Sequence, residues 1–561
     1  EDVHRALQAG AAVNARDEDG WTALMLVVRR GGEHAEAVIR ALLAAGADVN
    51  AQTNNGTTAL MLAARFGDEH GEAMMRALLE HPDVAVDAQD EVGRTALMRA
   101  AQHGAEHAEA MMRALIEAGA AVDAQDECGR TALMFAASHG GEHAAGMLAA
   151  QKGGEHAEAK MRLLVAAGAD ANKQDKGGFT ALTITARVGG EHAAGMMRAL
   201  LATGAAVNTQ TKHGRTALML AADDGGEHAE AMMRLLIAAD ADVNAQDTYG
   251  RNALMETAAC GGEHAEAKMR ALISAGASVN TQDEDGCTAL MFAAEGGERA
   301  EAMMRALTEH PDVAVNAQQK DGTTALMHSA RYGGEHAEAM MRVLVGAGAA
   351  IDARDTDGET ALMFAARGGE HAEAMMRLLV AAGAAVDARD TNGETALMFA
   401  VKKGGEHFEA MMRVLLTAGA DINAQDKDGW TALRFAARRG GEHAEGMVRL
   451  LVARGATHTR LHPDTPPAVA ASYLDGSRNW TPLHRAADAR DADALRECLR
   501  AGARPDEVVE SSHPHMRTAL SIANSDSYPT ARPICEHCLA LLRPSLVKGA
   551  MGAGGGGGGG A

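Results

Sequence analysis

The tripeptide Thr-Ala-Leu recurs at nearly constant intervals, and this regularity restricts the possible folds more than any other feature of the chain. Most intervals are 36 residues, with slips to 35 and 37 and one interval of 49. Asn252 replaces the Thr in one copy. A fixed period of this length predicts a solenoid, in which each copy buries its apolar face against its neighbours. The tripeptide begins at Thr22, Thr58, Thr95, Thr131, Thr180, Thr216, Thr288, Thr324, Thr360, Thr395 and Thr431.

Each copy reads as two helices followed by an extended turn. In the first full copy, the segment from Thr22 to Arg30 predicts a short helix, with Thr as its N-cap and a Gly-Gly pair ending it. Glu33 to Ala45 predicts a second helix, again closed by Gly. The residues after it, 47–56, predict an extended segment with an Asn-Gly turn at its tip. We call this segment the finger.

The repeated pattern resembles the ankyrin repeat. Its parts are Thr-Ala-Leu-Met-x-Ala-Ala, then Leu-Leu-x-x-Gly-Ala-Asp-Val-Asn-Ala, then Asp-x-x-Gly. The segment Thr-Pro-Leu-His-Arg-Ala-Ala at residues 481–487 matches the signature of that family closely. The resemblance implies an all-α fold, an ankyrin-type α-solenoid of helix-turn-helix repeats with protruding β-turn fingers.

The pattern divides the chain into four expected segments. Residues 1–456 form the repeat array, with a half repeat and twelve long repeats, one of them carrying a 13-residue insertion. Residues 457–479 are a linker or an enlarged finger, and 480–543 are two degenerate C-terminal ankyrin-like repeats. Residues 544–561 are a disordered Gly-rich tail. Glu1 falls within a copy, so we expect this end of the chain to be cut.

The copies depart from the ankyrin pattern in two ways. Three residues are added around Gly-Gly-Glu-His, and we expect them to lengthen the second helix by roughly 4.5 Å. The insertion is a duplication of the same motif, at residues 140–143 and again at 153–156, and we expect an extra helical turn or a loop there. Met, as in Met61 and Met98, stands where the family has a turn-bracing His.

The overall charge argues against nucleic acid and anionic membranes as partners. There are 53 basic and 76 acidic residues, which gives a net charge of −23. No apolar stretch is long enough to cross a membrane. The six scattered cysteines form no disulfide framework, which favours a reducing, intracellular location, most simply the cytoplasm.

Two features of the second helix predict how the array is stabilised. Glu and Arg recur at i and i+4, as in Glu36 and Arg40, and these pairs should lie on the solvent face. Methionine pairs such as Met74 and Met75 precede a Leu pair at a spacing that places them in the core.

The sequence predicts no catalytic site, metal site or cofactor. Glu-His occurs twelve times where the chain enters a second helix, and we interpret it as helix capping and solvation. A pH-responsive edge and a metal site are the alternatives, since histidine titrates near neutral pH and ligates zinc. Cys535 and Cys538 form a Cys-x-x-Cys with no second ligand pair. Motifs for phosphate binding and nucleophilic catalysis are lacking.

Binding should instead reside where the copies differ, at the finger tips and the ends of the first helices. The helix ends are mostly basic early in the chain, acidic or neutral from Asp223 to Glu295, and basic again from Arg331 to Arg439. Five phenylalanines, at positions 135, 292, 364, 399 and 435, share one register, and we expect them in the core or lining a groove rather than a pocket. The candidate partner-binding residues are Trp21, Arg29, Arg30, Arg65, Phe66, His103, Phe179, Asp223, Asp224, Tyr249, Tyr332, Arg367, Lys402, Lys403, Trp430, Arg438 and Arg439.

These observations predict a non-catalytic protein–protein interaction scaffold. A monomeric array would bind a partner protein or peptide along a concave groove. The alternative is the substrate-recognition or adaptor portion of a larger multidomain protein whose effector domain is missing. Nucleic-acid binding through the late basic stretch is the weakest of the three hypotheses, and a steep salt dependence would support it.

Overall fold

The structure is a computed structural model. It describes residues 10, 12–65, 70–102, 107–138, 150–223, 226, 228–262, 264–295, 297, 299–404, 407–439, 447, 450, 451 and 454–456. The predicted linker, degenerate repeats and Gly-rich tail lie outside these residues. The chain divides into two compact units, Glu1–Ala314 and Val315–Ala561.

Regular structure in the described residues consists of helices, and none of these helices is both long and apolar enough to span a bilayer. The first helices of the copies in unit 1 are α2 (Ala23–Arg30), α4 (Ala59–Arg65), α6 (Ala96–Gln102), α8 (Ala132–Ser138), α10 (Ala181–Val188), α12 (Ala217–Asp223), α14 (Ala253–Cys260) and α16 (Ala289–Glu295). The second helices in unit 1 are α3 (Ala35–Ala44), α5 (Gly71–Leu79), α7 (Ala108–Glu117), α9 (Ala150–Ala166), α11 (Ala193–Ala202), α13 (Ala229–Ala238), α15 (Ala265–Ser274) and α17 (Ala300–Thr308).

Unit 2 repeats this arrangement. Its first helices are α18 (Ala325–Tyr332), α20 (Ala361–Ala366), α22 (Ala396–Lys403) and α24 (Ala432–Arg439). Its second helices are α19 (Ala337–Gly346), preceded by the short 3-10 turn η1 (Gly334–His336), then α21 (Ala372–Ala381) and α23 (Phe408–Thr417).

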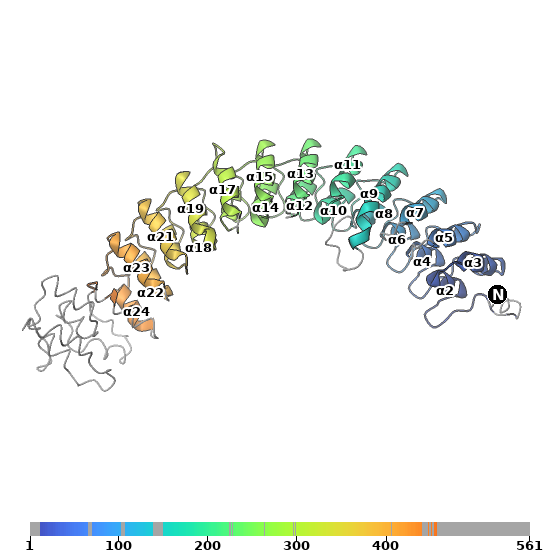
Figure 1. The fold of residues 1–561 in the computed structure, drawn as a ribbon, viewed down its shortest axis with the longest axis horizontal. Helices are drawn as coiled ribbons and strands as arrows, with labels where there is room; N and C mark the ends of the chain where they lie inside the picture. Colours follow the sequence, from blue (N-terminus) through green and yellow to red (C-terminus); the bar gives the residue numbers. More distant parts are fainter. Residues whose placement is uncertain are drawn as a thin grey trace, which may run out of the picture. The chain divides into compact units, whose positions relative to one another are not determined.

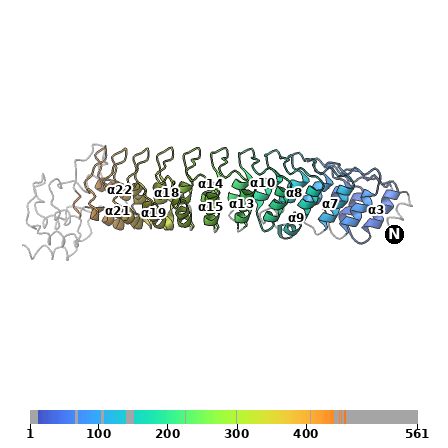
Figure 2. The same ribbon diagram turned by 90° about the horizontal axis from the view of Figure 1, so that it is seen from above.

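Within each unit the helices stack in two layers. In unit 2, α18 packs on α20, α20 on α22 and α22 on α24, while α19, α21 and α23 form the second layer (Figure 1). The fingers connect the two layers and project along one side of the helices (Figure 2). This arrangement confirms the predicted all-α solenoid.

The first helices begin and end where the sequence predicts. Thr22 is the N-cap of α2, and its side chain accepts a hydrogen bond from the amide of Met25. Asn252 replaces Thr without losing this bond, since its Oδ1 accepts from the amide of Met255 at 3.0 Å. Gly31 ends α2 with a φ of 61°, a left-handed value that glycine adopts without strain.

The predicted lengthening of the second helices is wrong. Helix α3 begins at Ala35, two residues later than expected, and has 10 residues. The added Gly-Gly-Glu-His residues lie in the connection before it, because paired glycines with positive φ let the chain turn there. Helix α9 differs, since its 17 residues include the second copy of the duplicated motif. The second copy of the motif is therefore helical, which is one of the two outcomes expected for the insertion. Residues 139–149, which include the first copy, lie outside the described residues.

Three histidines of the Glu-His motif in the described residues lie at the starts of second helices without capping them. His34, His107 and His192 each occupy an N-cap position, yet their side chains accept no capping hydrogen bond. The capping interpretation is therefore wrong for these copies. The short side chains of Ser, Thr, Asp and Asn place an oxygen where it accepts a hydrogen bond from a backbone amide of the first turn, and histidine has no such oxygen.

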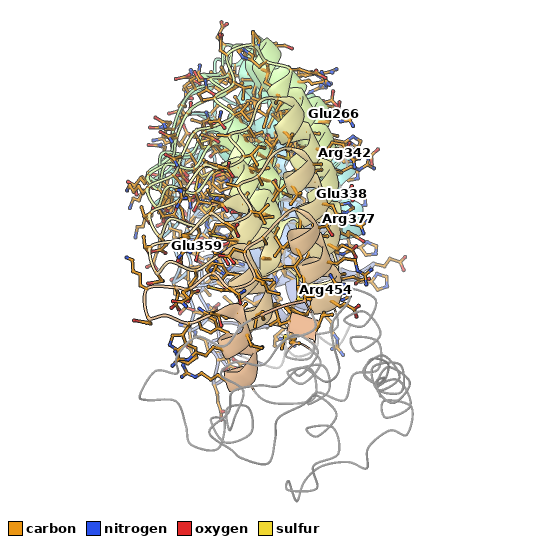
Figure 3. The ribbon with its side chains drawn as sticks, turned by 90° about the vertical axis from the view of Figure 1, so that its left-hand side faces the viewer. Glu266, Glu338, Arg342, Glu359, Arg377 and Arg454 are labelled. Carbon is orange, nitrogen blue, oxygen red and sulfur yellow. The ribbon has the colours of Figure 1, made fainter. Side chains whose placement is uncertain are left out.

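Methionine pairs form the core, as predicted. Met111 and Met112 in α7, like Met232 and Met233 in α13, have no exposed surface. The Glu-x-x-x-Arg pairs lie at the surface, and Arg342 meets Glu338 at 2.5 Å. In Figure 3, Glu338 and Arg342 lie on the side of the second helices, and Glu359 lies on the finger side.

Two lysines occupy methionine positions in this core. Lys160 of α9 and Lys268 of α15 are 0% and 1% exposed. Their Nζ atoms donate to main-chain oxygens of the preceding copy's first helix, Ala101 at 3.1 Å and Ala222 at 2.9 Å. Each ammonium group thus meets a carbonyl in the last turn of a helix, where a positive charge is favoured.

Hydrogen bonds between neighbouring fingers fix the spacing of the copies. The Oδ1 atom of Asn316 accepts from the amide of Ala350 at 2.6 Å, and its Nδ2 donates to the Gly348 carbonyl at 3.2 Å. Bonds of the first kind join successive fingers at many other copies, such as Asn208 to the amide of Asp242 at 2.8 Å. Each finger is therefore positioned by the one before it.

Candidate functional site

In each copy that the structure describes, three side chains lie between the finger and the first helix, and some of them are buried. Counted from the N-cap residue, they lie one position before it and four and seven positions after it. In the copy of Thr360 they are Glu359, Phe364 and Arg367. We call such a set of three a row, because ion pairs and ring contacts join its members.

The rows in unit 2 are joined to one another by cations over phenylalanine rings. Arg367 forms a two-bond ion pair with Glu359 in its own row, and its guanidinium lies 4.1 Å from the centroid of Phe399 in the next row. Lys402 repeats this arrangement, pairing with Glu394 and lying 4.5 Å from the ring centroid of Phe435. These contacts hold Arg367 and Lys402 in fixed positions and neutralise part of the late basic stretch.

The last described row in unit 2 is built on Trp430. The guanidinium groups of Arg434 and Arg438 lie 4.0 and 5.2 Å from its ring centroid, and the ring of Phe435 lies 5.2 Å away. The amide of Trp430 donates to Asp426 Oδ1 at 2.7 Å. Trp430 is thus a half-buried aromatic side chain with cations around it.

Rows in unit 1 use the same contacts with different residues. The guanidinium of Arg29 lies 4.8 Å from the centroid of Trp21, and that of Arg187 lies 4.4 Å from Phe179. Two other candidates outside the rows, Tyr249 of unit 1 and Tyr332 of unit 2, are 59% and 49% exposed. Exposed aromatic side chains of this size favour contacts with a partner.

The acidic part of unit 1 is internally compensated. Arg215 lies 2.9 Å from a carboxylate oxygen of Asp223 and 3.7 Å from one of Glu256. Burial raises the pKa of the Glu256 carboxyl, and the charge of Arg215 opposes this rise.

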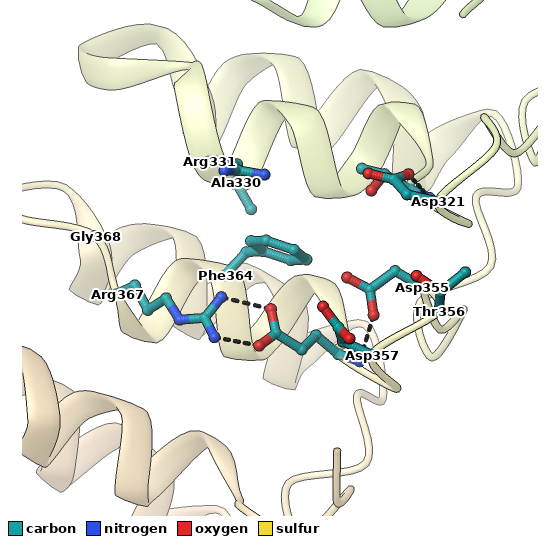
Figure 4. Close-up of a pocket in the computed structure, with 11 residues that line it drawn as sticks. Asp321, Ala330, Arg331, Asp355, Thr356, Asp357, Phe364, Arg367 and Gly368 are labelled. Atoms are coloured by element: carbon teal, nitrogen blue, oxygen red, sulfur yellow. Dashed lines mark hydrogen bonds and ion pairs between the residues drawn. The ribbon is translucent and has the colours of Figure 1, made fainter. Parts of the chain in front are cut away.

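A cavity of about 480 Å³ opens between two copies of unit 2 (Figure 4). Carboxylates of Asp321 and Asp355 lie on its finger side, and Arg331 and Arg367 lie on the helix-end side. The ring of Phe364 is between them. It is 5% exposed, which confirms the predicted core position, but it also lines this pocket, which the prediction excluded. The complete lining is Asp321, Thr323, Ala330, Arg331, Asp355, Thr356, Asp357, Glu359, Phe364, Arg367 and Gly368.

Asp355 is held in place by the backbone around it. Its Oδ1 accepts the Glu359 amide at 2.7 Å. Gly322 of the preceding finger has a φ of +82°, and a Cβ there would lie 2.8 Å from the Asp355 Cα, so only glycine fits. Burial raises the pKa of the Asp355 carboxyl, and the carboxylates of Glu359 and Asp357 raise it further.

The candidate residues have different surroundings. Arg29, Arg30, Arg65, Asp223, Lys402, Lys403 and Arg438 are exposed, while Trp21, Phe179, Arg367 and Trp430 are half-buried. Phe66, His103 and Asp224 lie outside the described residues, as does the side chain of Arg439. Sequence reasoning missed the acidic members of the rows, although Glu359 and Glu394 stand at one fixed offset from the cations they pair with.

No group of three or more His, Cys, Asp or Glu side chains among the described residues is arranged to hold a metal ion.

Comparison with protein families agrees with the geometry. The family model described as ankyrin repeats, with three copies per model, matches residues 1–90, 69–160, 146–247, 224–317, 300–380, 335–426, 365–462 and 403–508. Comparison with curated proteins gave no match.

Proposed function

The chain belongs to the ankyrin-repeat family, whose repeats are generally protein–protein interaction modules and whose arrays are typically non-catalytic, and we propose that it binds a partner protein or peptide along the rows. The partner segment lies against the fingers and first helices, across several copies. The proposal assigns recognition to the side chains that differ between copies.

The observation that carries this proposal is the contrast between the core and the rows. The Met pairs are buried at the same positions in copy after copy. The row of Thr324, by comparison, is Thr323, His328 and Arg331, and that of Thr431 has Trp430 as its first member. A repeated core specifies the stacking, whereas only varied surfaces distinguish one partner from another.

The rows also have the chemistry of interaction surfaces. They combine Trp, Phe and Arg, and aromatic residues and Arg are enriched at interfaces. Contacts between a cation and a ring, such as Arg434 over Trp430, restrict both side chains before binding. Restricting them in advance lowers the entropy cost of association.

A selection experiment tests the proposal. The full-length chain is presented to a phage-displayed library of random dodecapeptides, and affinities of the selected peptides are measured by fluorescence anisotropy. A variant with Lys402, Lys403, Arg438 and Arg439 changed to Glu should bind most peptides at least about tenfold more weakly, because it reverses the row cations Lys402 and Arg438 and the cation that follows each of them in sequence.

The matched control reverses four arginines on the second helices, Arg305, Arg342, Arg377 and Arg413. Each of these arginines pairs with a Glu of its own second helix, away from the rows, so peptide affinity should be retained. Circular dichroism verifies that both variants keep their helices. Equal affinities for the two variants, or no selected peptide at all, would refute the assignment of binding to the rows.

A further inference from the structure

Unit 1 contains a position at which the chain binds its own guanidinium group. Arg251, from one copy, lies 4.8 Å from the ring centroid of Phe292 in the next copy. The same guanidinium lies 3.6 Å from a carboxylate oxygen of Asp283. The cation is therefore held between an aromatic ring and a finger carboxylate.

A second pair of copies in unit 1 repeats this geometry. The guanidinium of Arg94 lies 5.4 Å from the centroid of Phe135 and 3.9 Å from a carboxylate oxygen of Asp126. In both cases the Arg precedes the Asp by 32 residues and the Phe by 41. The arrangement is thus a property of these offsets in the repeat.

The cavity in unit 2 is lined by residues at the same repeat positions, but the first of these residues is not an arginine. Asp355 and Phe364 correspond to the Asp and Phe of unit 1, but Thr323 stands where Arg94 and Arg251 stand. A Thr side chain ends at Cγ2 and Oγ1, so this position places no cation over the ring. The guanidinium groups of Arg331 and Arg367 lie 5.8 and 5.5 Å from the Phe364 centroid. The cavity of about 480 Å³, which these residues line in part, has room for a further group from outside the chain.

The charges around the cavity favour a cation. Four carboxylates (Asp321, Asp355, Asp357 and Glu359) and two guanidinium groups line it, which leaves a formal charge of −2 (two minus four). Glu359 already holds Arg367 through two hydrogen bonds. The other cation, Arg331, lies 5.8 Å from the Phe364 centroid and belongs to the helix-end side.

Asp355 is the carboxylate best placed to receive the cation. One of its oxygens already accepts the Glu359 amide. Burial raises the pKa of this carboxyl, and the neighbouring carboxylates of Glu359 and Asp357 raise it further. An added positive charge would relieve this unfavourable environment.

We propose that the cavity formed by Thr323, Asp355 and Phe364 receives an arginine side chain from the bound partner. This inference rests on the proposed function, and it specifies one residue of the partner segment. The planar guanidinium lies beside Phe364 and forms an ion pair with Asp355, as Arg251 pairs with Asp283 beside Phe292 in unit 1. Lysine fits less well, because its ammonium group is compact and strongly hydrated.

The test uses the full-length chain and the dodecapeptides selected on it. An Arg is expected at a fixed position of the selected peptides. Replacing that Arg by citrulline, which keeps the shape and removes the charge, should weaken binding about tenfold or more. The variant Asp355→Asn should weaken the Arg peptide similarly but leave the citrulline peptide unchanged, since the lost contact is the same in both.

Two further variants sharpen the test. Thr323→Arg supplies the internal guanidinium seen in unit 1, and it should reduce affinity for the Arg peptide by filling the cavity. Asp390→Asn is the matched control, because Asp390 accepts the Glu394 amide at 2.6 Å just as Asp355 accepts that of Glu359, yet does not line the cavity.

The outcomes separate the two proposals. Peptides that bind the rows but show no coupling between their Arg and Asp355 overturn the arginine assignment and leave the proposed function standing. Equal effects of the variants at Asp355 and Asp390 also overturn it. Failure of the chain to select any peptide refutes the proposed function, and the arginine assignment with it.

Discussion

Replacing Lys160 by Met should stabilise unit 1 around α9. Lys160 is 0% exposed, and burial lowers the pKa of its ammonium group from 10.5 to about 8. At pH 7 the folded protein therefore contains a charged group in its core. Met111 and Met232 occupy the same position in other copies without any exposed surface, so the space already suits Met.

The magnitude follows from the pKa difference. A difference of about 2.5 units corresponds to about 3.4 kcal/mol favouring the neutral form on burial. Met also removes the hydrogen bond to the Ala101 carbonyl, and a buried polar group without a partner costs about 1–3 kcal/mol. The net gain at pH 7 is then about 1.5 kcal/mol, or roughly a tenfold decrease in local opening.

The pH dependence has a defined sign. The pKa of Lys160 in the folded protein lies below that of the unfolded chain, so the unfolded chain binds more protons between pH 8 and 10.5. Wild-type stability should therefore rise with pH in this interval, by up to about 1.4 kcal/mol per pH unit. The variant lacks this rise, and its advantage over the wild type should shrink as pH increases.

Hydrogen–deuterium exchange with mass spectrometry measures local opening in peptides from α7, α9 and α11. Comparing the variant with the wild type at each pH between 7 and 9.5 cancels the titration of groups that both share. Lys176→Met is the control, since Lys176 is exposed and loses the same charge at the surface. An advantage that stays constant with pH, or faster opening in the Lys160 variant, would contradict the role given to burial.

Three other predictions concern the fingers and the cysteines. Asn316→Ala removes two finger bonds, so the amide of Ala350 should exchange faster, by a factor equivalent to about 1–3 kcal/mol; unchanged exchange would mean that the bond is absent. Gly322→Ala should lower the unfolding temperature of unit 2, because its φ is positive and the backbone of the next finger lies close to it. Gly383→Ala is the control for the positive φ alone, because Gly383 also has a positive φ but has open space around it. Burial raises the pKa of the Cys287 thiol to about 12, helped by nearby carboxylates, so iodoacetamide at pH 8 should label the exposed Cys128 first; peptide mapping showing equal labelling would argue against this.

The helical pairs could be predicted from sequence because their signals are local. Thr22 is followed by an apolar periodic run and then by Gly31, and the structure places the ends of α2 accordingly. The start of α3 was missed by two residues. His34 occupies its N-cap position without a side-chain hydrogen bond, so no residue-specific signal marks that boundary.

The site was only partly predictable because its contacts join residues that are distant in sequence. The charge of Arg367 was evident, but its pairing with Glu359 depends on how the finger meets α20. The cavity depends on Thr323, which precedes Phe364 by 41 residues and belongs to the preceding copy. Thr323 and Phe364 occupy the same repeat positions as Arg94 and Phe135. The importance of these positions became evident only when the structure showed that Arg94 lies against the ring of Phe135.

The side-chain bonds between fingers have a consequence for how this gene can change length. Each one, such as Asn316 to the amide of Ala350, joins a copy only to its immediate successor. Unequal recombination that adds or deletes a whole copy therefore regenerates the same junction at the new boundary. Such an event would change the distance between Trp430 and the cavity by one fixed step, so that a ligand touching both would lose one contact while the protein still folds.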